Sequence, residues 1–544
     1  MNVLAVIPAR GGSKGIPRKN MRLMNGVPLI EYAIKHALEC SVIDAVAVSS
    51  DSQEILTFAA QFQEVHALKR GTDLSQDAVT LDPVIYDAVL QMESITSSRY
   101  DAVVTLQPTS PLLSVETLTK AIEKFESSDC DSIISVVNDP HLSWRKDKNN
   151  EVVPNYKERL NRQQLPPCYF ETGAFFISRR DVVTRNGRLG TKTGVYEVPS
   201  EESVDIDTWQ DWVLCETSFA RKKIVFRVDG YPELGLGHIY RCLTLAYECT
   251  EHEITFITRS EHKEGVKKLK AANMNVVEIS SDREVLEWLE RNRPDVFVND
   301  CLDTMSDYVQ AVKKYVGRFV SFEDLGEGIY YADAVVNAIY EGASSLPNIY
   351  TGKRYVCLRD EFLTARPKPF SETVNNVLIM FGGTDPLNLS QRLYEIASGY
   401  NSNGIRVKFD FILGSGYNHK FPCTDHNLGI TVVQDVARVT EYMKRADLAF
   451  SSQGRTTFEL ATMGVPAVVL AQNEREQLHP FAQMDNGFIN LGLGTEVSNE
   501  DICQTLDWLV KSPSIRKEMH HLMLQNDLKS GIKRVKRILL GELE

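Results

Sequence analysis

Two glycine-containing loops carry the residue types that bind anions and transfer protons. The first, PARGGSKGIPRKN at residues 8–20, follows an apolar run and combines three glycines with several arginines and lysines. Because glycine has no Cβ, the backbone N–H groups of such a turn can approach phosphates, and the basic side chains add charge. The loop matches neither the P-loop nor the dinucleotide-binding pattern. It predicts a nucleoside triphosphate site, with a solvated turn as the alternative.

The second loop, FRVDGYPELGLGHIYRC at residues 226–242, places Asp229 and His238 around a strand-to-helix turn. Histidine is the side chain best suited to proton transfer near neutral pH. Arg241 occupies the position of the last glycine of the dinucleotide pattern, so this loop fails that pattern too. We expect His238 to act in proton transfer with Asp229 beside it; a structural histidine is the alternative.

The elements that must position these loops are short β-branched runs alternating with helical stretches. VLAVIPA followed by PLIEYAIKHALEC is the first such pair. This alternation is typical of an α/β fold with parallel sheets that bind ligands at the carboxyl ends of the strands. A chain of 544 residues exceeds one hydrophobic core. We expect a Rossmann-like domain at 1–220, followed by a pair of Rossmann-like lobes at 223–370 and 371–544.

The bulk composition narrows the functional class. A net charge of -13 argues against a nucleic-acid partner, because no global positive field gathers phosphates. The ten cysteines are dispersed and form no CxxC pair, which suits reduced thiols in a cytoplasm. No stretch approaches the roughly 20 apolar residues of a membrane span. We therefore expect a cytoplasmic protein that binds neither nucleic acid nor membrane.

Four ordered motifs in the first domain resemble those of the CMP-sialic acid synthetases, which are cytidylyltransferases that activate nonulosonic acids with CTP. The motifs are IPARGGSKGIPRKN, LQPTSPL, RQQLP and VDIDTWQDW. The resemblance implies that Arg10 and Lys19 act on the CTP phosphates and that Gln107 lies near the attacking sugar hydroxyl. The nucleotide- and sugar-binding residues that it further implies are Gly11, Gly12, Lys14, Asn20, Arg70 and Arg162.

The same resemblance implies that Asp205 and Asp207 hold Mg²⁺. Alternate residues of an extended segment share a face, so this spacing lets both carboxylates point at one ion. The implied reaction is attack of the anomeric hydroxyl on the α-phosphorus of CTP with release of pyrophosphate, in a homodimer formed through this domain. Where many relatives have Asn-Gly-Ala, this chain has Thr172-Gly173-Ala174. The identity of the nonulosonic acid therefore stays open.

Motifs in the second half resemble the nucleotide-sugar hydrolase of pseudaminic acid biosynthesis, a GT-B-like enzyme. They are FRVDG with LGLGHIYRC, SFEDLGEG, LRDEF, FGGTD and SSQGRTTFELATMGVP. The resemblance implies cleavage of UDP from a 2,4-diacetamido-2,4,6-trideoxy sugar, without a cofactor, by a water that His238 serves. The residues expected to bind the UDP-sugar are Gly382, Gly383, Thr384, Ser452, Gly454, Thr456 and Glu459.

One departure from the hydrolase pattern leaves three functions open for this half. The family has a tyrosine two residues after an aspartate, whereas this chain has Leu302 two residues after Asp300. Leucine cannot form a hydrogen bond through its side chain. The second half is expected to be a hydrolase, with a glycosyltransferase and a non-catalytic nucleotide-sugar-binding module as alternatives.

Overall fold

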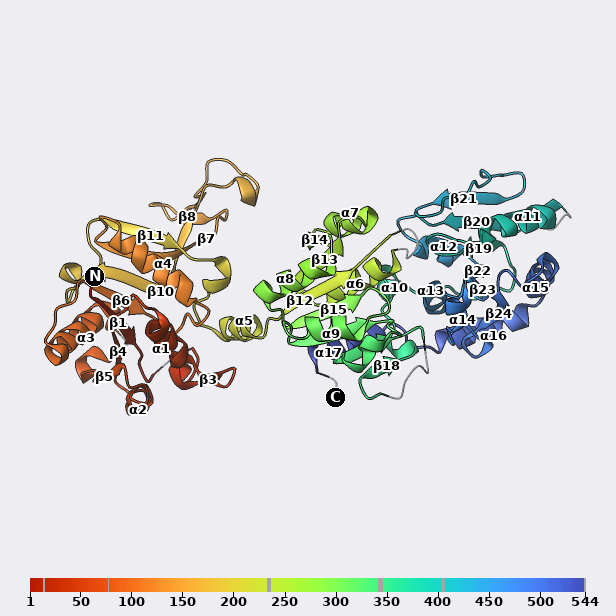
Figure 1. Ribbon diagram of the computed structural model, residues 1–544. Coiled ribbons are helices and arrows are strands. Elements are labelled where there is room, and N and C mark those ends of the chain that lie inside the picture. The colour runs from red at the N-terminus through yellow and green to blue at the C-terminus, as the bar shows by residue number, and fades with distance from the viewer. Residues whose placement is uncertain (13–14, 77, 232–235, 341–345, 403–406, 543–544) are drawn as a thin grey trace. The chain divides into compact units, whose positions relative to one another are not determined.

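The chain folds into two compact units, Met1–Arg221 and Lys222–Glu544 (Figure 1). The computed structural model describes residues 1–544 except 13–14, 77, 232–235, 341–345, 403–406 and 543–544. The sequence placed a domain boundary near residue 221, after the helix that contains the WQDW motif. That helix is α5 (Trp209–Phe219), and it closes the first unit.

The first unit is built on a seven-stranded sheet with the order β11-β7-β10-β6-β1-β4-β5. Strand β1 (Val3–Pro8) lies between β6 and β4 and pairs in parallel with both, and β10 runs antiparallel to its neighbours. The other strands are β4 (Ala45–Ser50), β5 (Val65–Lys69), β6 (Ala102–Leu106), β7 (Ser132–Asn138), β10 (Tyr169–Arg179) and β11 (Thr193–Glu197). Two short hairpins, β2 (Leu23–Met24) with β3 (Val27–Pro28) and β8 (Trp144–Lys146) with β9 (Val152–Pro154), lie outside this sheet.

Helices cover both faces of this sheet, which explains the continuous apolar run of β1. Val3, Ala5 and Ile7 belong to a core formed with α1, α2 and α4, whereas Leu4 and Val6 belong to a core formed with α3. Alternate strand residues point to opposite faces, so a strand buried on both sides must be apolar throughout. The helices are α1 (Leu29–Glu39), α2 (Gln53–Ala59), α3 (Leu81–Thr96) and α4 (Val115–Glu126).

The second unit contains two parallel sheets, which confirms the predicted pair of Rossmann-like lobes. The first lobe has the strand order β14-β13-β12-β15-β16-β17-β18. The order reverses at β12, which lies between β13 and β15. Its strands are β12 (Lys223–Val228), β13 (Glu253–Arg259), β14 (Asn275–Ile279), β15 (Val296–Asp300), β16 (Arg318–Phe322), β17 (Ala334–Asn337) and β18 (Ile349–Thr351). Its helices are α6 (Gly237–Glu248), α7 (Lys263–Ala271), α8 (Asp282–Asn292) and α9 (Ser306–Val312), and α10 (Asp360–Thr364) leads to the second lobe.

The second lobe has the strand order β21-β20-β19-β22-β23-β24. Its strands are β19 (Asn376–Met380), β20 (Lys408–Leu413), β21 (Ile430–Gln434), β22 (Leu448–Ser452), β23 (Ala467–Ala471) and β24 (Phe488–Leu493). Its helices are α11 (Leu389–Ser402), α12 (Thr440–Arg445), α13 (Thr456–Met463), α14 (Glu474–Gln477), α15 (Asn499–Lys511) and α16 (Pro513–Leu524).

The helix α17 (Gly531–Leu540) departs from the expected lobe boundaries. Residues 371–544 were expected to form the second lobe, but α17 packs into the first (Figure 1). Its apolar side chains Ile532, Val535 and Ile538 share one core with β12 and α6. Their spacing of three residues places them on one face of the helix, and the first lobe provides the apolar surface that buries this face.

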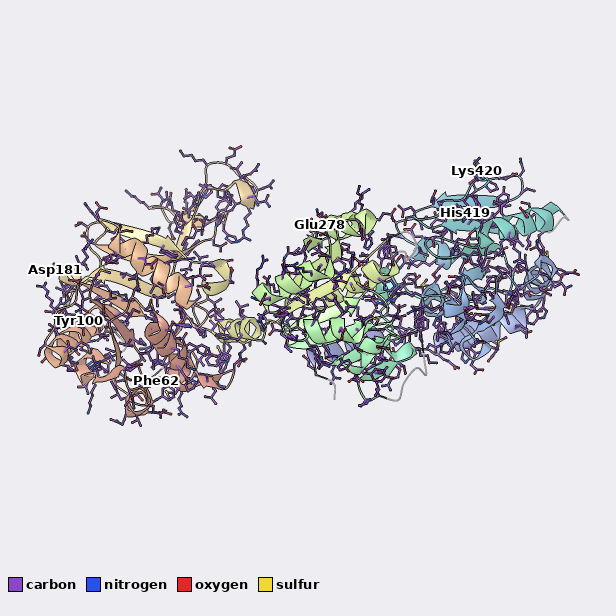
Figure 2. All side chains as sticks on the ribbon, in the orientation of Figure 1. Phe62, Tyr100, Asp181, Glu278, His419 and Lys420 are labelled. Carbon is purple, nitrogen blue, oxygen red and sulfur yellow. The ribbon has the colours of Figure 1, made fainter. Side chains whose placement is uncertain are left out.

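Figure 2 shows the side chains of both units, with the charged residues Asp181 and Glu278 among those labelled. Glu278 on β14 pairs with Lys270 on α7 at 2.6 Å, and exposed Asp181 pairs with Arg99. Within the ranges that the structure describes, no helix combines the length and the apolar character that crossing a membrane requires.

Candidate functional sites

The first candidate site lies in the first unit, where β1 ends and the glycine-rich loop begins. The Gly11 N–H donates to Asp51 Oδ1 at 2.8 Å, across from β4. Asn20 Nδ2 donates to the carbonyl oxygen of Arg10 at 2.9 Å, which ties the end of the loop to its start. Around Gly12 there is open space, so its backbone can be approached closely. Lys14 lies outside the described residues.

Two arginines lie near each other at this loop but differ in exposure. Arg10 is exposed, whereas Arg70 is buried and donates to the carbonyl oxygen of Ser49 at 2.7 Å. Burial lowers the pKa of Arg70, which the charge of Asp51 opposes and that of Arg10 reinforces. Arg70 therefore supports the strand end on which the loop rests, while Arg10 remains accessible to a ligand.

The segment that carries the two aspartates meets the loop through Lys19. Lys19 Nζ donates to the carbonyl oxygen of Ile206 at 2.5 Å and lies 3.4 Å from Asp207 Oδ1. Gln107 and Asp205 both lie next to Gly173. A Cβ placed on Gly173, whose φ is +71°, would lie 3.2 Å from both Asp205 Oδ2 and Gln107 Nε2. The structure thus brings the predicted basic, amide and acidic residues together.

The chemistry of the two carboxylates fits a divalent cation. Burial raises the pKa of Asp205; the nearby Thr109 hydroxyl opposes this rise, and the Asp207 carboxylate adds to it. Asp205 Oδ1 is buried without a hydrogen-bond partner among the described residues. A bound cation would stabilise the buried charge of Asp205 and would provide the missing partner for its Oδ1. The described residues contain no group of three or more His, Cys, Asp or Glu that could hold a metal, so the remaining ligands would come from phosphates and water, as is common for Mg²⁺.

The described contacts of Arg162 and Thr172 are with residues other than the Asp205–Asp207 pair. The Arg162 side chain is 68% exposed and pairs with Asp139 at 2.7 Å, and its described contacts do not include the acidic pair. Thr172 is buried, and its hydroxyl donates to Ser135 Oγ at 2.8 Å. The hydroxyl that replaces the amide of many relatives therefore serves the sheet interior.

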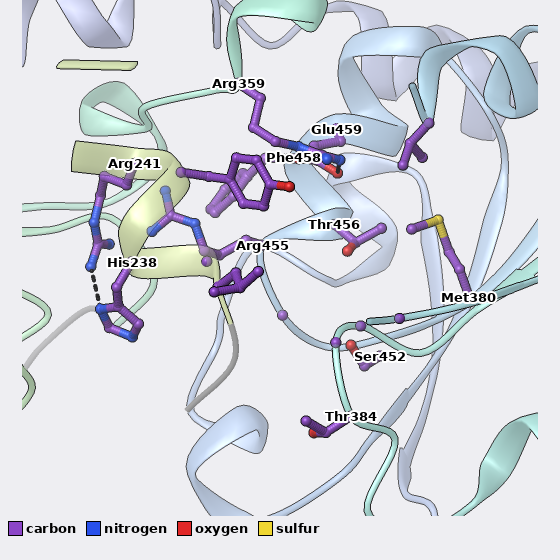
Figure 3. Close-up of a pocket in the computed structure, with 18 of the residues that line it drawn as sticks. His238, Arg241, Arg359, Met380, Thr384, Ser452, Arg455, Thr456, Phe458 and Glu459 are labelled. Carbon is purple, nitrogen blue, oxygen red and sulfur yellow. Dashed lines mark hydrogen bonds and ion pairs between the residues drawn. The ribbon is translucent and has the colours of Figure 1, made fainter. Parts of the chain in front are cut away.

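The second candidate site is a cavity of about 370 Å³ between the two lobes of the second unit (Figure 3). The first lobe contributes His238 and Arg241 from α6, and Glu323, which directly follows β16. The second lobe contributes the loops after β19 and β22 together with α13. The predicted UDP-sugar residues all line it: Gly382, Gly383, Thr384, Ser452, Gly454, Thr456 and Glu459.

His238 is held by a carboxylate from the neighbouring strand. Its Nδ1 lies 2.5 Å from Asp300 Oδ1 and 3.1 Å from Arg241 Nη2. Burial opposes ionisation of Asp300, but the charges of Arg241 and His238 outweigh it and hold the pKa of this carboxyl well below its usual range. We assign the proton to Nδ1, which donates to Asp300. Nε2 is then the nitrogen that can accept a proton in the cavity.

The predicted partnership of Asp229 with His238 is wrong. Asp229 pairs with Arg227 at 2.7 Å and lies 3.0 Å from His262 Nδ1. The strand register gives the reason. Val228 is paired with Asp300 and shares its face, so Asp229, the next residue, points to the opposite face. Sequence reasoning missed Asp300 as the partner, although its position at the carboxyl end of a strand was a usable signal.

The loop after β22 is held by two hydrogen bonds between Gln453 and His479. Gln453 Nε2 donates to the carbonyl oxygen of His479 at 2.9 Å, and His479 Nδ1 donates in return to the carbonyl oxygen of Gln453 at 3.0 Å. Burial lowers the pKa of His479 to about 4, so this histidine is a neutral structural group. These hydrogen bonds fix the backbone at Gln453, between Ser452 and Gly454, which both line the cavity.

Glu459, one turn inside α13, is held by Arg359. Arg359 Nε donates to one carboxylate oxygen at 2.7 Å and Nη2 to the other at 2.9 Å. Such two-point pairs fix the plane of a carboxylate. Each oxygen keeps a second lone pair, and Glu459 lines the cavity, so it can still accept from a ligand hydroxyl.

Comparisons with known proteins identify relatives of the first unit. A family model described as cytidylyltransferase matches residues 4–215. Pseudaminic acid cytidylyltransferase of Campylobacter jejuni is 33% identical over 237 residues, which cover 42% of this chain and 98% of that protein. CMP-N,N'-diacetyllegionaminic acid synthase of Legionella pneumophila is 32% identical, over 40% of this chain and 95% of that protein. The chain spans 57% of an uncharacterized Methanocaldococcus jannaschii protein that is 31% identical to it.

Solved structures resemble each unit only distantly. MurG of Acinetobacter baumannii has 15% identity and a TM-score of 0.44, over 59% of this chain and 99% of that one. A CMP:2-keto-3-deoxy-manno-octonic acid synthetase has 15% identity and a TM-score of 0.30, over 40% of this chain and 99% of that one. Likenesses at this level add nothing to the assignment of function.

Proposed function

Because the chain belongs to the cytidylyltransferase family through residues 4–215, we propose that its first unit transfers CMP from CTP to a nonulosonic acid. The observation that carries this proposal is the convergence of Lys19, Gln107 and the Asp205–Asp207 pair beside the glycine-rich loop. The names of the relatives support acids of the pseudaminic or legionaminic class as substrates.

In the proposed reaction, the anomeric hydroxyl attacks the α-phosphorus of CTP, loses its proton, and displaces pyrophosphate. Arg10 and the backbone N–H groups of Gly11 and Gly12 would bind the phosphates. Lys19 would neutralise negative charge, and Gln107 would orient the hydroxyl. Asp205 and Asp207 would hold Mg²⁺, which supplies further charge neutralisation at the phosphates. Catalysis then consists of positioning and electrostatics, without a covalent intermediate.

The test is pyrophosphate release from CTP in the presence of Mg²⁺ and a panel of sugar acids. Pseudaminic, legionaminic and N-acetylneuraminic acids would be compared with the shorter 2-keto-3-deoxy-manno-octonic acid. We expect release with at least one nonulosonic acid and its loss in K19M. Equal rates with and without every acid would overturn the proposal.

We propose that the second unit hydrolyses a UDP-linked 2,4-diacetamido-2,4,6-trideoxy sugar. The observation that carries this is the His238–Asp300 pair in the same cavity as the loops that contain Gly382 and Ser452. His238 Nε2 would take a proton from water as the water oxygen bonds to the anomeric carbon and UDP leaves. The helix N-terminus at Thr456 would favour the diphosphate.

One observation favours a glycosyltransferase as the second candidate. Ile339, Val356 and Leu358 give the cavity an apolar wall, which would suit an acceptor other than water. UDP release at a rate independent of any acceptor identifies the hydrolase. Release that requires an acceptor identifies the transferase, and UDP-sugar binding without any release identifies a binding module. The homodimer and the cytoplasmic location remain predictions from the sequence.

A further inference from the structure

Arg455 connects the nucleotide loop of the second lobe to the surroundings of His238 in the first. It immediately precedes α13, and its Nη1 donates to Glu323 Oε1 at 2.9 Å. Its Nη2 donates to the carbonyl oxygen of Cys357 at 3.2 Å. Its aliphatic stem passes the turn before the histidine, because a Cβ on Gly237 would lie 3.5 Å from Arg455 Cδ. One side chain of the second lobe thus donates two hydrogen bonds to the first lobe and passes beside Gly237, at the edge of the histidine site.

Glu323 links this arginine to the histidine through an unbroken series of charges. The Glu323 carboxylate also contacts Arg241, whose Nε donates to Asp300 Oδ2 at 2.7 Å. Asp300 in turn accepts from His238 Nδ1. Two positive and two negative groups therefore alternate from the nucleotide loop to the imidazole. Buried charge series of this kind hold their members in one geometry, since losing one member leaves another uncompensated.

Glu323 is buried and has an unfavourable backbone conformation, so its surroundings must hold it in place. The residue is 4% exposed and has a φ of +51°, in the left-handed region that side chains other than glycine rarely adopt. This conformation costs about 1 kcal/mol, and it persists at sites where the surroundings determine it. Other polar groups around the imidazole are the Cys242 thiol, which donates to Asp300 Oδ2 at 3.3 Å, and Glu264 of α7, which lines the same cavity.

We propose that Arg455 and Glu323 are positioning residues that complete the His238 site only when the second lobe is docked on the first. This inference rests on the proposed role of His238 in UDP-sugar chemistry. The loop that binds the nucleotide supplies Arg455, so docking of the lobe and orientation of the histidine occur together. Without Arg455, the buried Glu323 carboxylate loses one of its two cationic partners and is held by Arg241 alone, so its geometry and that of the Arg241–Asp300–His238 series are no longer fixed from the second lobe.

Arg475 provides a matched control. It lies on α14 of the second lobe and donates to Asp303 Oδ1 at 3.1 Å and to the carbonyl oxygen of Glu323 at 3.1 Å. It therefore joins the same two lobes without touching a side chain of the charge series. A variant of Arg475 weakens the contact between the two lobes while every side chain of the charge series stays in place.

The test is NMR of the full chain with ¹⁵N-labelled histidine, without ligand, in wild type, R455M and R475M. H238Q assigns the signal. We expect wild type and R475M to show one tautomer with a slowly exchanging Nδ1 proton, and R455M to show mixed tautomers with fast exchange. A wild-type signal in R455M would overturn the inference, because Asp300 and Arg241 would then suffice. Equal loss in R475M would also overturn it, because general lobe contact would then be the cause.

Two further measurements test the inference if R455M fails to fold and if the second unit does not release UDP. If R455M does not fold, E323Q, which keeps the side-chain shape, should show the same loss of the single tautomer. In a UDP-release assay, R455M should lower kcat by about 10- to 100-fold, as loss of a group that orients an active-site ligand does, with little change in KM. Absence of UDP release from wild type would count against the proposed function and leave the NMR comparison intact.

Discussion

Asp300 accepts a hydrogen bond from His238 Nδ1 at 2.5 Å, and it comes from β15 rather than from the turn that carries the histidine. The pairing of β15 with β12 therefore sets the orientation of the imidazole. A rigid strand is a more precise support than a loop, because its register is fixed along its whole length.

Replacing Asp300 with asparagine should abolish most UDP release. The amide has no negative charge to hold the Nδ1–H tautomer, and Arg241 loses its buried partner. We expect a fall of about 10²- to 10⁴-fold, the usual contribution of general acid–base catalysis. The measurement is the rate of UDP release by D300N, with circular dichroism to verify folding. A rate within a factor of a few of wild type would show that UDP release does not depend on the Asp300 carboxylate holding the His238 tautomer.

Replacing Asp229 with asparagine should mainly affect stability. Arg227 would remain buried with an uncompensated charge, which costs about 3–5 kcal/mol when one partner of a buried pair is removed. Urea denaturation of D229N and wild type would measure this difference. Unchanged stability together with lost UDP release would instead assign Asp229 to catalysis, as the sequence had indicated.

Alanine at Gly173 should damage the first site without touching the nucleotide loop. The φ of +71° is unfavourable for alanine, and its Cβ would press on Asp205 and Gln107 at 3.2 Å. A misplacement of 1 Å lowers rates by about 10²-fold, and the groups here must move by a few tenths of an ångström, so we expect a loss of up to about 10²-fold. Pyrophosphate release should fall accordingly, while UDP release by the other unit serves as the internal control. Normal pyrophosphate release would contradict the proposed roles of both side chains.

Chelation should separate the two activities. EDTA, or the D207A substitution, should stop pyrophosphate release, because the Asp205–Asp207 pair would no longer bring a cation to the phosphates. UDP release should continue at its original rate, since the cavity of the second unit works through His238. Both assays run on one sample of the full chain. Loss of both activities on chelation would show that the second unit also needs a metal.

Acid should weaken the second unit through His479. Its pKa is about 4 in the folded protein against an ordinary 6.5, so between these values the unfolded chain binds a proton that the folded chain does not. Stability from this group is therefore complete above about pH 6.5 and is lost as the pH falls toward 4, by about 3 kcal/mol in total. In H479N the amide can still donate to Gln453. Urea denaturation from about pH 7 down to about pH 4 should show a smaller decline for H479N, and an equal decline would exclude His479 as a cause.

The pattern of strands and helices predicted most of the fold, because buried parallel strands leave a strong apolar signal. Gly382, Ser452 and Glu459, which the resemblance to a nucleotide-sugar hydrolase implied, all line the cavity of the second unit. The partner of His238 was not predicted. Asp300 ends a strand, which marks it as a candidate, but which of Asp229 and Asp300 reaches the imidazole depends on strand register, a property of tertiary pairing.

The position of α17 bears on the order in which the protein can fold. Ile532 and Val535 complete the core around β12, yet about 300 residues of chain are synthesised between the two. The lobe that carries His238 therefore remains unfinished on the ribosome until the second lobe has emerged. A stop codon in place of Ser530 would leave every residue of both sites encoded, and would still remove the helix that completes the core of the lobe that carries His238.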